Sequence, residues 1–507
     1  MEVAVSYSNQ QQQHLGGVVD DLQQVVLLED ISIGLTCGNS YNTSLESIVM
    51  EAFREFSSES IDNYSKGVTL IPLDLLLGKE EIKQGIPIVK CKTICKYVDN
   101  LCHSLSTNSM WRFVAPQALM DTVSNKIIFK YLNRQFSLLH LACIFNRLDL
   151  LEWLEALCCE LNICDEINHC PSCHQRRENL WSTVKDSNDV FPLFYSIEFG
   201  SLECCAFLCS QPIVRDSQLN LKRDHLGNLP IALALQKKDY VMCDTLRLFG
   251  ASFDVTNGLS FGLGLAESLM HQIMRKQDYE GFRYLATHSP KVILKKNQRG
   301  ESPLFSCLKD KRNNYKDDLV QTTASFGSVD GKPIYVPSYI LFFSKILESS
   351  VSLLGEELLQ KALLSRNNFG RNVLMESVIM HDFESSKLLC KFLMRNYLSE
   401  GNARFSAGVS MNKYNFLKEL VFDKDITGMT IFFYAFSTTV RYISLTNESA
   451  NQTYQMLTKL YKHTSASNQT LKAYLKEKYS TKNLDVKTRN LVSSSFKYWQ
   501  KLEDSTE

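Results

Sequence analysis

The densest group of side chains that could bind a metal lies between residues 158 and 174. The Cys170-Pro-Ser-Cys173 step places two thiolates on one tight turn, a geometry that tetrahedral zinc favours. Cys158 precedes this step, and the residues that could complete the coordination are Cys159, Cys164, His169 and His174. Cys164, Cys170, Cys173 and His174 are the candidate ligands of one structural zinc ion, which would stiffen a long loop.

Two other interpretations of this segment remain. The second half of the zinc site lacks a Cys-x-x-Cys partner, so the alternative is a cysteine-containing surface loop without metal. A redox role for Cys170 and Cys173 is disfavoured, because the strand-then-helix pattern of a thioredoxin-like motif does not surround them.

Elsewhere the signatures of common active sites are missing. The sequence contains neither the Gly-x-Gly-x-x-Gly and Gly-x-x-x-x-Gly-Lys-Ser/Thr loops that bind phosphates nor a His-Glu-x-x-His motif. It also lacks the Gly-x-Ser-x-Gly turn of a nucleophilic serine. We therefore expect no catalytic residue and no organic cofactor, and the chain is predicted not to be an enzyme.

The elements that must position the cysteine segment belong to a repeated pattern. Each copy has Asp or Asn, a glycine three residues on, a small or polar residue two later, and an apolar stretch that opens a helix. The copies are Asp224–Ala234, Asn297–Cys307, Asn367–Ser377 and Asp425–Ala435. Such a unit cannot bury its apolar face alone, so the copies must stack.

This pattern resembles the ankyrin repeat, in which Asp-x-x-Gly-x-Thr-Pro-Leu-His-x-Ala precedes two antiparallel helices and a hairpin loop. Ser137-Leu-Leu-His140 keeps the family's histidine, and Gly250-Ala251 is typical of the end of a unit. The resemblance covers about residues 134–465. It implies an all-α fold, an ankyrin-repeat solenoid of stacked helix pairs with hairpin loops, an N-terminal helical region and C-terminal capping helices.

The spacing of the units agrees with this resemblance once insertions are allowed. Residues at the Thr position fall at 137, 191, 229, 268, 302, 372 and 430, which gives intervals of 54, 38, 39, 34, 70 and 58 against a family period of about 33. If Val336–Leu341 opens a further unit, the interval of 70 divides into 34 and 36. The intervals of 54 and 58 need insertions, placed at about 158–185 and 391–424. Helices should open near Ser137, Pro192, Pro230, Ser302, Asn372 and Thr430.

The motif residues have structural roles in this interpretation. Gly227 and Gly428 suit a tight turn at positive φ, which other residues adopt only at a cost. His140 and His271 occupy the position of the ankyrin histidine, which bonds locally within its turn. Neither histidine is therefore expected to act as a general base.

Outside the repeats the sequence indicates further segments. Residues 1–43 are expected to be largely disordered, and residues 44–133 to form a helical region of no assigned type. Residues 134–465 hold the repeats, and residues 466–507 are predicted to be capping helices. Helical spacing of apolar residues predicts N-terminal helices over Ser44–Ser57, Ile88–Leu105 and Pro116–Tyr131.

Composition limits the class of partner. The chain has 55 Lys and Arg against 55 Asp and Glu, a balance that favours neither nucleic acid nor an anionic membrane. No stretch approaches the roughly twenty apolar residues that span a bilayer, and the N-terminus lacks the pattern of a signal peptide. The 16 cysteines are therefore expected to be reduced, in an intracellular protein of the cytoplasm or nucleus.

Together these observations predict a non-catalytic scaffold or adaptor. Repeat stacks of this kind bind proteins on a concave surface and at their hairpin tips. The resemblance thus implies a partner protein, while the sequence specifies neither its identity nor an oligomeric state. The alternative is a regulator whose N-terminal helical region carries a separate activity and whose repeats serve as a targeting module.

Overall fold

The computed structural model describes residues 64–65, 68–76, 87–107, 127–131, 134–157, 171–255, 266–309, 319–322, 334–398, 407–442, 448–465, 470–479 and 493. The chain divides into two compact units, Met1–Ser187 and Asn188–Glu507. The predicted disordered segment 1–43 and the predicted helix over Ser44–Ser57 lie outside the described residues. Those two predictions, and the domain boundaries drawn from the sequence, stay predictions.

The first unit contains a four-stranded sheet that the sequence analysis missed. The strands lie in the order β1-β2-β3-β4, with β2 and β3 parallel and the two outer pairs antiparallel. Their bounds are β1 Tyr64–Ser65, β2 Val68–Pro72, β3 Ile127–Tyr131 and β4 Arg134–Phe136. The region 44–133 is therefore not purely helical, and the helix predicted over Pro116–Tyr131 is wrong at its C-terminal end.

The cause of this error is visible in β3. Ile127 and Phe129 are buried, whereas Ile128 and Lys130, which alternate with them along the strand, are partly exposed. This alternation has the period of a strand, and its β-branched and aromatic residues fit a pleated surface. The helix prediction over residues 116–131 therefore included a segment in which buried and exposed side chains alternate with the period of two that is typical of a strand.

The helix predicted over Ile88–Leu105 is confirmed. It consists of the short helix η2 (Ile88–Lys90) followed by α4 (Lys92–Thr107), and a further short helix, η1 (Leu73–Leu76), follows β2. In the first unit α4 packs on α7 (Leu148–Leu157), while β3 and β4 contact α6 (Leu138–Ile144). The sheet and α4 thus cover the first helix pair, and α8 (Pro171–Thr183) lies within the insertion that was predicted at 158–185.

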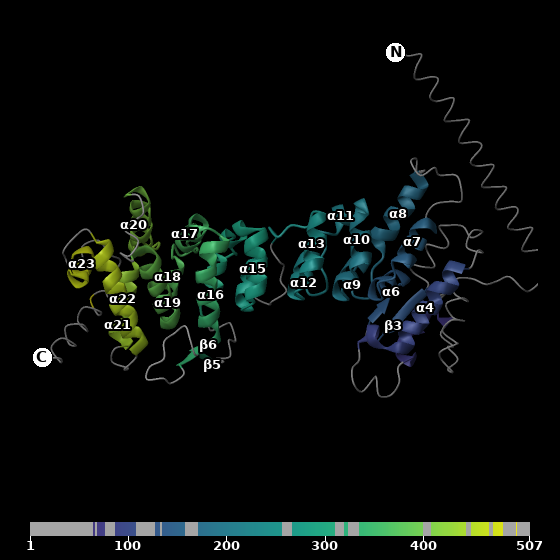
Figure 1. Cartoon of the computed structure of the whole chain (residues 1–507), viewed down its shortest axis with the longest axis horizontal. Helices are drawn as coiled ribbons and strands as arrows, with labels where there is room; N and C mark the ends of the chain where they lie inside the picture. The colour runs from purple at the N-terminus through teal and green to yellow at the C-terminus, as the bar shows by residue number, and fades with distance from the viewer. Residues whose placement is uncertain are drawn as a thin grey trace, which may run out of the picture. The chain divides into compact units, whose positions relative to one another are not determined.

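The second unit is a helical repeat solenoid, which confirms the predicted fold class (Figure 1). The first helices of its pairs are α9 (Pro192–Glu198), α12 (Pro230–Gln236), α14 (Leu269–Arg275), η6 (Pro303–Cys307), α18 (Val373–Ile379) and α21 (Ile431–Tyr442). The second helices are α10 (Leu202–Ser210), α13 (Tyr240–Leu248), α15 (Tyr279–His288), α16 (Ser338–Leu353), α19 (Phe383–Leu393) and α22 (Glu448–Thr464). First helices pack on first helices, as α9 does on α12 and α18 on α21, and second helices pack on second helices.

The first helices open where the sequence predicted. Ser137 and Asn372 are the N-caps of α6 and α18, and prolines occupy the first turn of α9 and α12, a position whose N–H has no helical partner in any case. At Ser302 the element is a 3₁₀ helix, η6. Its first turn nevertheless lies in the row of first helices, between α14 and α18.

The predicted extra unit at Val336–Leu341 is wrong. A helix does open there, but α16 packs on α15 and α19, which are second helices. It is therefore the second helix of the unit that η6 begins, displaced along the chain by an insertion that contains the hairpin β5 (Leu319–Thr322) and β6 (Ile334–Pro337). Both ends of this insertion are fixed to one buried carboxylate, because Asp382 accepts hydrogen bonds from the Lys309 N–H at 2.8 Å and the Tyr339 hydroxyl at 3.0 Å.

Additional elements stand between a second helix and the next hairpin in several units. They are α11 (Pro212–Ser217), η5 (Pro290–Leu294), α17 (Glu356–Leu364) and, within the insertion predicted at 391–424, η7 (Met394–Leu398) and α20 (Ala407–Phe422). At the C-terminal end, α23 (Leu471–Lys478) packs on α21 and α22. The Tyr479 hydroxyl, directly after α23, accepts a hydrogen bond from the Thr430 N–H at 3.0 Å. This bond ties the end of α23 to the start of α21.

The hairpin turns that precede the first helices share one construction. The leading Asp or Asn accepts two N–H bonds from its own turn, as Asp425 does from Thr427 at 2.8 Å and Met429 at 3.0 Å. The glycine of each turn has positive φ, 74° at Gly370 and 78° at Gly428. Successive hairpins also bond to each other, since the Ile426 N–H donates to the Phe369 carbonyl at 3.1 Å.

Two of these glycines differ in their surroundings, which allows a matched test. A Cβ at Gly370 would lie 2.9 Å from the Ile426 nitrogen, whereas a Cβ at Gly428 would meet nothing within 4 Å. We expect Gly428→Ala to cost about 1 kcal/mol for the positive φ alone, and Gly370→Ala about 2 kcal/mol or more, because the next hairpin must also move. Thermal unfolding of the two purified variants measures the difference. Equal losses would contradict the close packing of adjacent hairpins.

Candidate functional site

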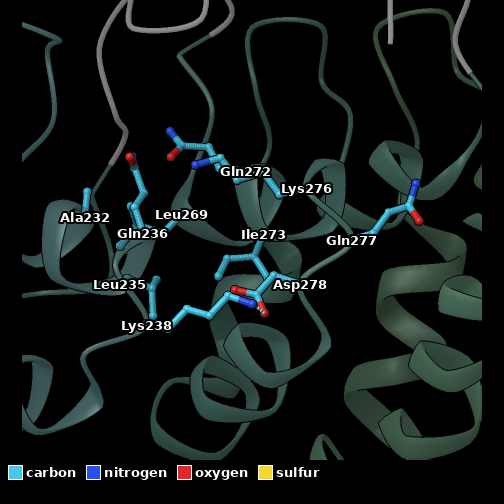
Figure 2. A pocket seen from close by; sticks show the side chains of 10 residues that line it. All are labelled: Ala232, Leu235, Gln236, Lys238, Leu269, Gln272, Ile273, Lys276, Gln277 and Asp278. Atoms are coloured by element: carbon cyan, nitrogen blue, oxygen red, sulfur yellow. Dashed lines mark ion pairs between the residues drawn. The ribbon is translucent and has the colours of Figure 1, made fainter. Parts of the chain in front are cut away.

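A cleft lies between two first helices of the second unit. It has a volume of ≈ 370 Å³ and lies between α12 and α14 (Figure 2). The residues that line it are Ala232, Leu235, Gln236, Lys238, Leu269, Gln272, Ile273, Lys276, Gln277 and Asp278. Apolar side chains thus form part of the wall, and amide and charged groups form the remainder.

The polar groups of the cleft are held in place by neighbouring elements. The Lys238 ammonium pairs with the Asp278 carboxylate at 3.2 Å, and Asp278 also accepts the Gly281 N–H at 3.3 Å as the N-cap of α15. The Gln236 amide donates to Asn228 at 2.7 Å. Figure 2 shows Gln236 and Gln272 reaching from the two helices towards one space, with Lys238 directed at Asp278. Fixed amides of this kind can bond the backbone of an extended peptide.

Two residues of the cleft have a strained backbone. Lys238 has φ of 60° and Gln277 of 54°, in the left-handed region that favours glycine. Both occupy the turn between a first and a second helix, where the preceding unit has Gly200 at φ 72°. The same turn has positive φ at Asn146 and His381, which do not line the cleft, so this conformation is common to the turn, and Lys238 and Gln277 differ in that they line the cleft.

Sequence reasoning missed Lys238 and Gln277, although a signal was present. The glycine between the helices, Gly200, marks a turn that recurs in each unit, and the same turn has positive φ at Asn146 and His381. Aligning the units on this turn, and not only on the hairpin glycines, would have placed Lys238 and Gln277 in a strained position.

The hairpin tips form a second exposed feature. Leu226, Phe369 and Ile426 occupy the tips of three hairpins and have exposed fractions of 56%, 53% and 72%. The Arg371 guanidinium lies over the Phe369 ring at 5.0 Å from its centroid and 3.6 Å from the Asp425 carboxylate. The tips therefore present exposed apolar side chains, and at Phe369 a guanidinium that is itself ion-paired covers the ring.

The two motif histidines are structural. The Ser137 hydroxyl and the His140 Nδ1 are 2.9 Å apart, and the equivalent Ser268–His271 distance is 2.7 Å. In the second pair Nδ1 also accepts the Ser268 N–H, which leaves Nε2 as the donor to the Glu301 carbonyl at 2.9 Å. His271 thus joins the start of α14 to the next hairpin, and burial lowers its pKa to about 4. It is neutral at pH 7 and has no exposed nitrogen for acid–base chemistry.

The cysteine segment is only partly described. Cys164 and Cys170 lie outside the described residues, while Cys173 and His174 fall in the first turn of α8, where their side chains are not described. Among the residues that the structure does describe, no group of three or more His, Cys, Asp or Glu could hold a metal. The predicted zinc site at Cys164, Cys170, Cys173 and His174 stays a prediction.

In the described part of the chain, no helix is both long and apolar enough to cross a bilayer.

The buried histidine makes stability depend on pH. The pKa of His271 is lower in the folded chain than its ordinary value of 6.5, so its contribution is complete above about pH 6.5 and is lost as the pH falls towards 4. The loss amounts to up to about 3 kcal/mol. His271→Gln keeps a side chain that suits this capping position but cannot titrate. Chemical denaturation at several pH values should give a steeper acid loss for the parent than for this variant, with exposed His225→Gln as control. Parallel curves would refute the assignment.

The zinc prediction can be tested on the purified chain. We expect near-stoichiometric zinc by elemental analysis, because four thiolate and imidazole ligands can satisfy its tetrahedral preference. The double variant Cys170→Ser/Cys173→Ser should lose this zinc, while Cys390→Ser, which replaces a buried cysteine in α19, should retain it. If the parent chain, purified without chelators, contains no zinc, the segment is a cysteine-containing loop that binds no metal.

Comparison with known proteins gives little further guidance. No protein-family model matches the chain, and no curated protein does. Among solved structures it is similar to EF0377, described as an ankyrin repeat protein, with 17% identity over 52% of this chain and 95% of that chain and a TM-score of 0.28. It is also similar to the Bd0816 predatory endopeptidase of Bdellovibrio bacteriovorus in complex with the immunity protein Bd3460, with 17% identity over 50% of this chain and 96% of that chain and a TM-score of 0.28. At this TM-score neither similarity supports a conclusion about this chain.

Proposed function

We propose that this chain is a non-catalytic, ankyrin-type interaction module, a scaffold or adaptor, that binds an extended segment of a partner protein in the cleft between α12 and α14. One observation carries the proposal. Two long polar residues that line the cleft, Lys238 and Gln277, are held at positive φ, where glycine would be more stable. Their side chains are then retained for contact with a ligand.

The character of the cleft supports a peptide as this ligand. Leu235, Leu269 and Ile273 give it an apolar part, while amides from both helices can satisfy the N–H and C=O groups of an extended backbone. The exposed hairpin tips extend the surface available to a partner. Small hollows of mixed character on a rigid scaffold suit a peptide better than a compact metabolite, which is usually enclosed.

The histidines, the cysteines and the charge balance of the chain also support the proposal. Neither buried histidine is suited to proton transfer, since both are engaged in capping their own helices, and this supports a non-catalytic role. Ten cysteines of the described residues form no disulfide, and nine of these are buried, which supports an intracellular location, where thiols stay reduced. The equal numbers of acidic and basic residues support a protein partner over nucleic acid.

Glycine at positions 238 and 277 should change stability and binding in opposite directions. Replacing Lys238 and Gln277 by glycine relieves two strained positions, and we expect an unchanged or higher melting temperature, with a gain of up to about 1 kcal/mol per site. The same change removes the side chains of two lining residues, of which Lys238 points towards Asp278 within the cleft (Figure 2), so proteins recovered by affinity purification and quantified by mass spectrometry should fall at least severalfold.

A matched control separates the cleft from the turn. His381 has φ of 61° in the same turn of another unit and does not line the cleft. His381→Gly should therefore raise stability in the same way while leaving the recovered proteins unchanged. Full recovery of the partners by the Lys238→Gly/Gln277→Gly variant would place the interaction elsewhere.

A further inference from the structure

A positively charged residue directly precedes the first residue of four hairpins in the second unit. These residues, here called the basic row, are Arg223, Lys296, Arg366 and Lys424, which stand before Asp224, Asn297, Asn367 and Asp425. Lys296, Arg366 and Lys424 are exposed. The Lys296 ammonium donates to the Arg366 carbonyl at 2.7 Å, so consecutive members are close together in the stack.

A shallow pocket adjoins the last two members of the row. It has a volume of ≈ 580 Å³, and its lining includes Arg366, Lys418, Glu419, Phe422 and Lys424. Arg366 is already neutralised, because its guanidinium pairs with the buried Asp423 carboxylate at 2.5 Å. Among the residues that the structure describes, neither Lys418 nor Lys424 has an ion-pair partner. The pocket thus has two cations whose charge its other carboxylate, Glu419, balances only in part.

A further cation lies beside this pocket. Lys478, on α23, rests against the Tyr474 ring at 4.9 Å from its centroid and donates to the Tyr474 hydroxyl. The Tyr474 ring in turn lies 5.9 Å from the Phe422 ring, centroid to centroid, and Phe422 lines the pocket. Burial and the Lys424 ammonium both lower the pKa of Lys478. Cations gathered at one concave surface attract an anionic ligand more strongly than the same charges dispersed.

An apolar side chain follows each of the last two cations of the basic row within two or three residues. Phe369 and Ile426 are exposed at the tips of the two hairpins that Arg366 and Lys424 precede. The backbone bond between Ile426 and Phe369 fixes the two tips next to each other. The surface therefore combines cations at the base of the hairpins with apolar side chains at their tips.

We propose that this surface, formed by Lys418, Lys424 and the tips at Phe369 and Ile426, binds an acidic segment of a partner protein that has apolar residues among its carboxylates. A polypeptide can place its carboxylates opposite the lysines and avoid Glu419, whereas a nucleic acid has a charge at every phosphate and would meet that glutamate. The surface is built from other units than the cleft between α12 and α14, so it is a second contact region, and it does not rest on the first.

The test uses the full chain and a short fluorescein-labelled peptide of glutamate with interspersed leucine, followed by fluorescence anisotropy. We expect binding that weakens as salt is raised, and at least a tenfold loss of affinity in Lys418→Glu/Lys424→Glu. The matched control is Lys459→Glu/Lys462→Glu, which makes the same charge change on two exposed lysines of α22 and should bind within twofold of the parent. Phe369→Ser should also weaken binding without any change in charge.

Three results would overturn the proposal. The first is an equal loss in the two double variants, which would indicate an effect of net charge alone. The second is equal binding of the same peptide with glutamine in place of glutamate, because the cations would then have no role. The third is tighter binding of a short single-stranded DNA than of the acidic peptide, which would assign the surface to nucleic acid. Circular dichroism melting of every variant ensures that folded proteins are compared.

Discussion

The second unit depends on one constraint, that a short helix pair cannot bury both of its apolar faces. In α18 the residues Val373, Leu374, Met375 and Val378 are almost fully buried, yet they point to more than one side of a helix that is only two turns long. Burial of this kind needs a neighbour on each side, and α18 has η6 on one side and α21 on the other. The stability of each unit therefore comes mainly from its interfaces with adjacent units.

This constraint explains which positions are free to vary. The row of first helices must stay continuous, so η6 keeps its place between α14 and α18 even as a 3₁₀ turn. The segment between a second helix and the next hairpin is not part of this continuous row. It can therefore contain elements as different as η5 and α20. In the described part of the chain, the insertion between η6 and α16 follows a first helix, and both of its ends are fixed to Asp382.

The same reasoning shows how far the sequence could lead. The starts of α6, α9, α12, α18 and α21 were predictable, because caps and N-terminal prolines act locally. The role of α16 was not, since period alone cannot tell a first helix from a second one, and only its packing on α15 and α19 decides. The sheet of the first unit was missed because β2 and β3 pair in parallel across a long stretch of chain. The residues of the cleft were missed because strain at Lys238 is a property of backbone conformation.

The two proposed contact regions lie at positions that do not form the buried interfaces between helices. A repeat stack fixes the residues between its units and leaves free the turns between paired helices and the ends of the connecting segments. Lys238 and Gln277 occupy the first kind of position, and Lys296, Arg366 and Lys424 the second. These positions lie outside the buried faces of the helices, although Lys238 and Lys296 each bond to the adjacent unit, so their exposed side chains can also contact a partner. A surface built in this way gains area with each added unit, which is why we propose extended segments as its ligands.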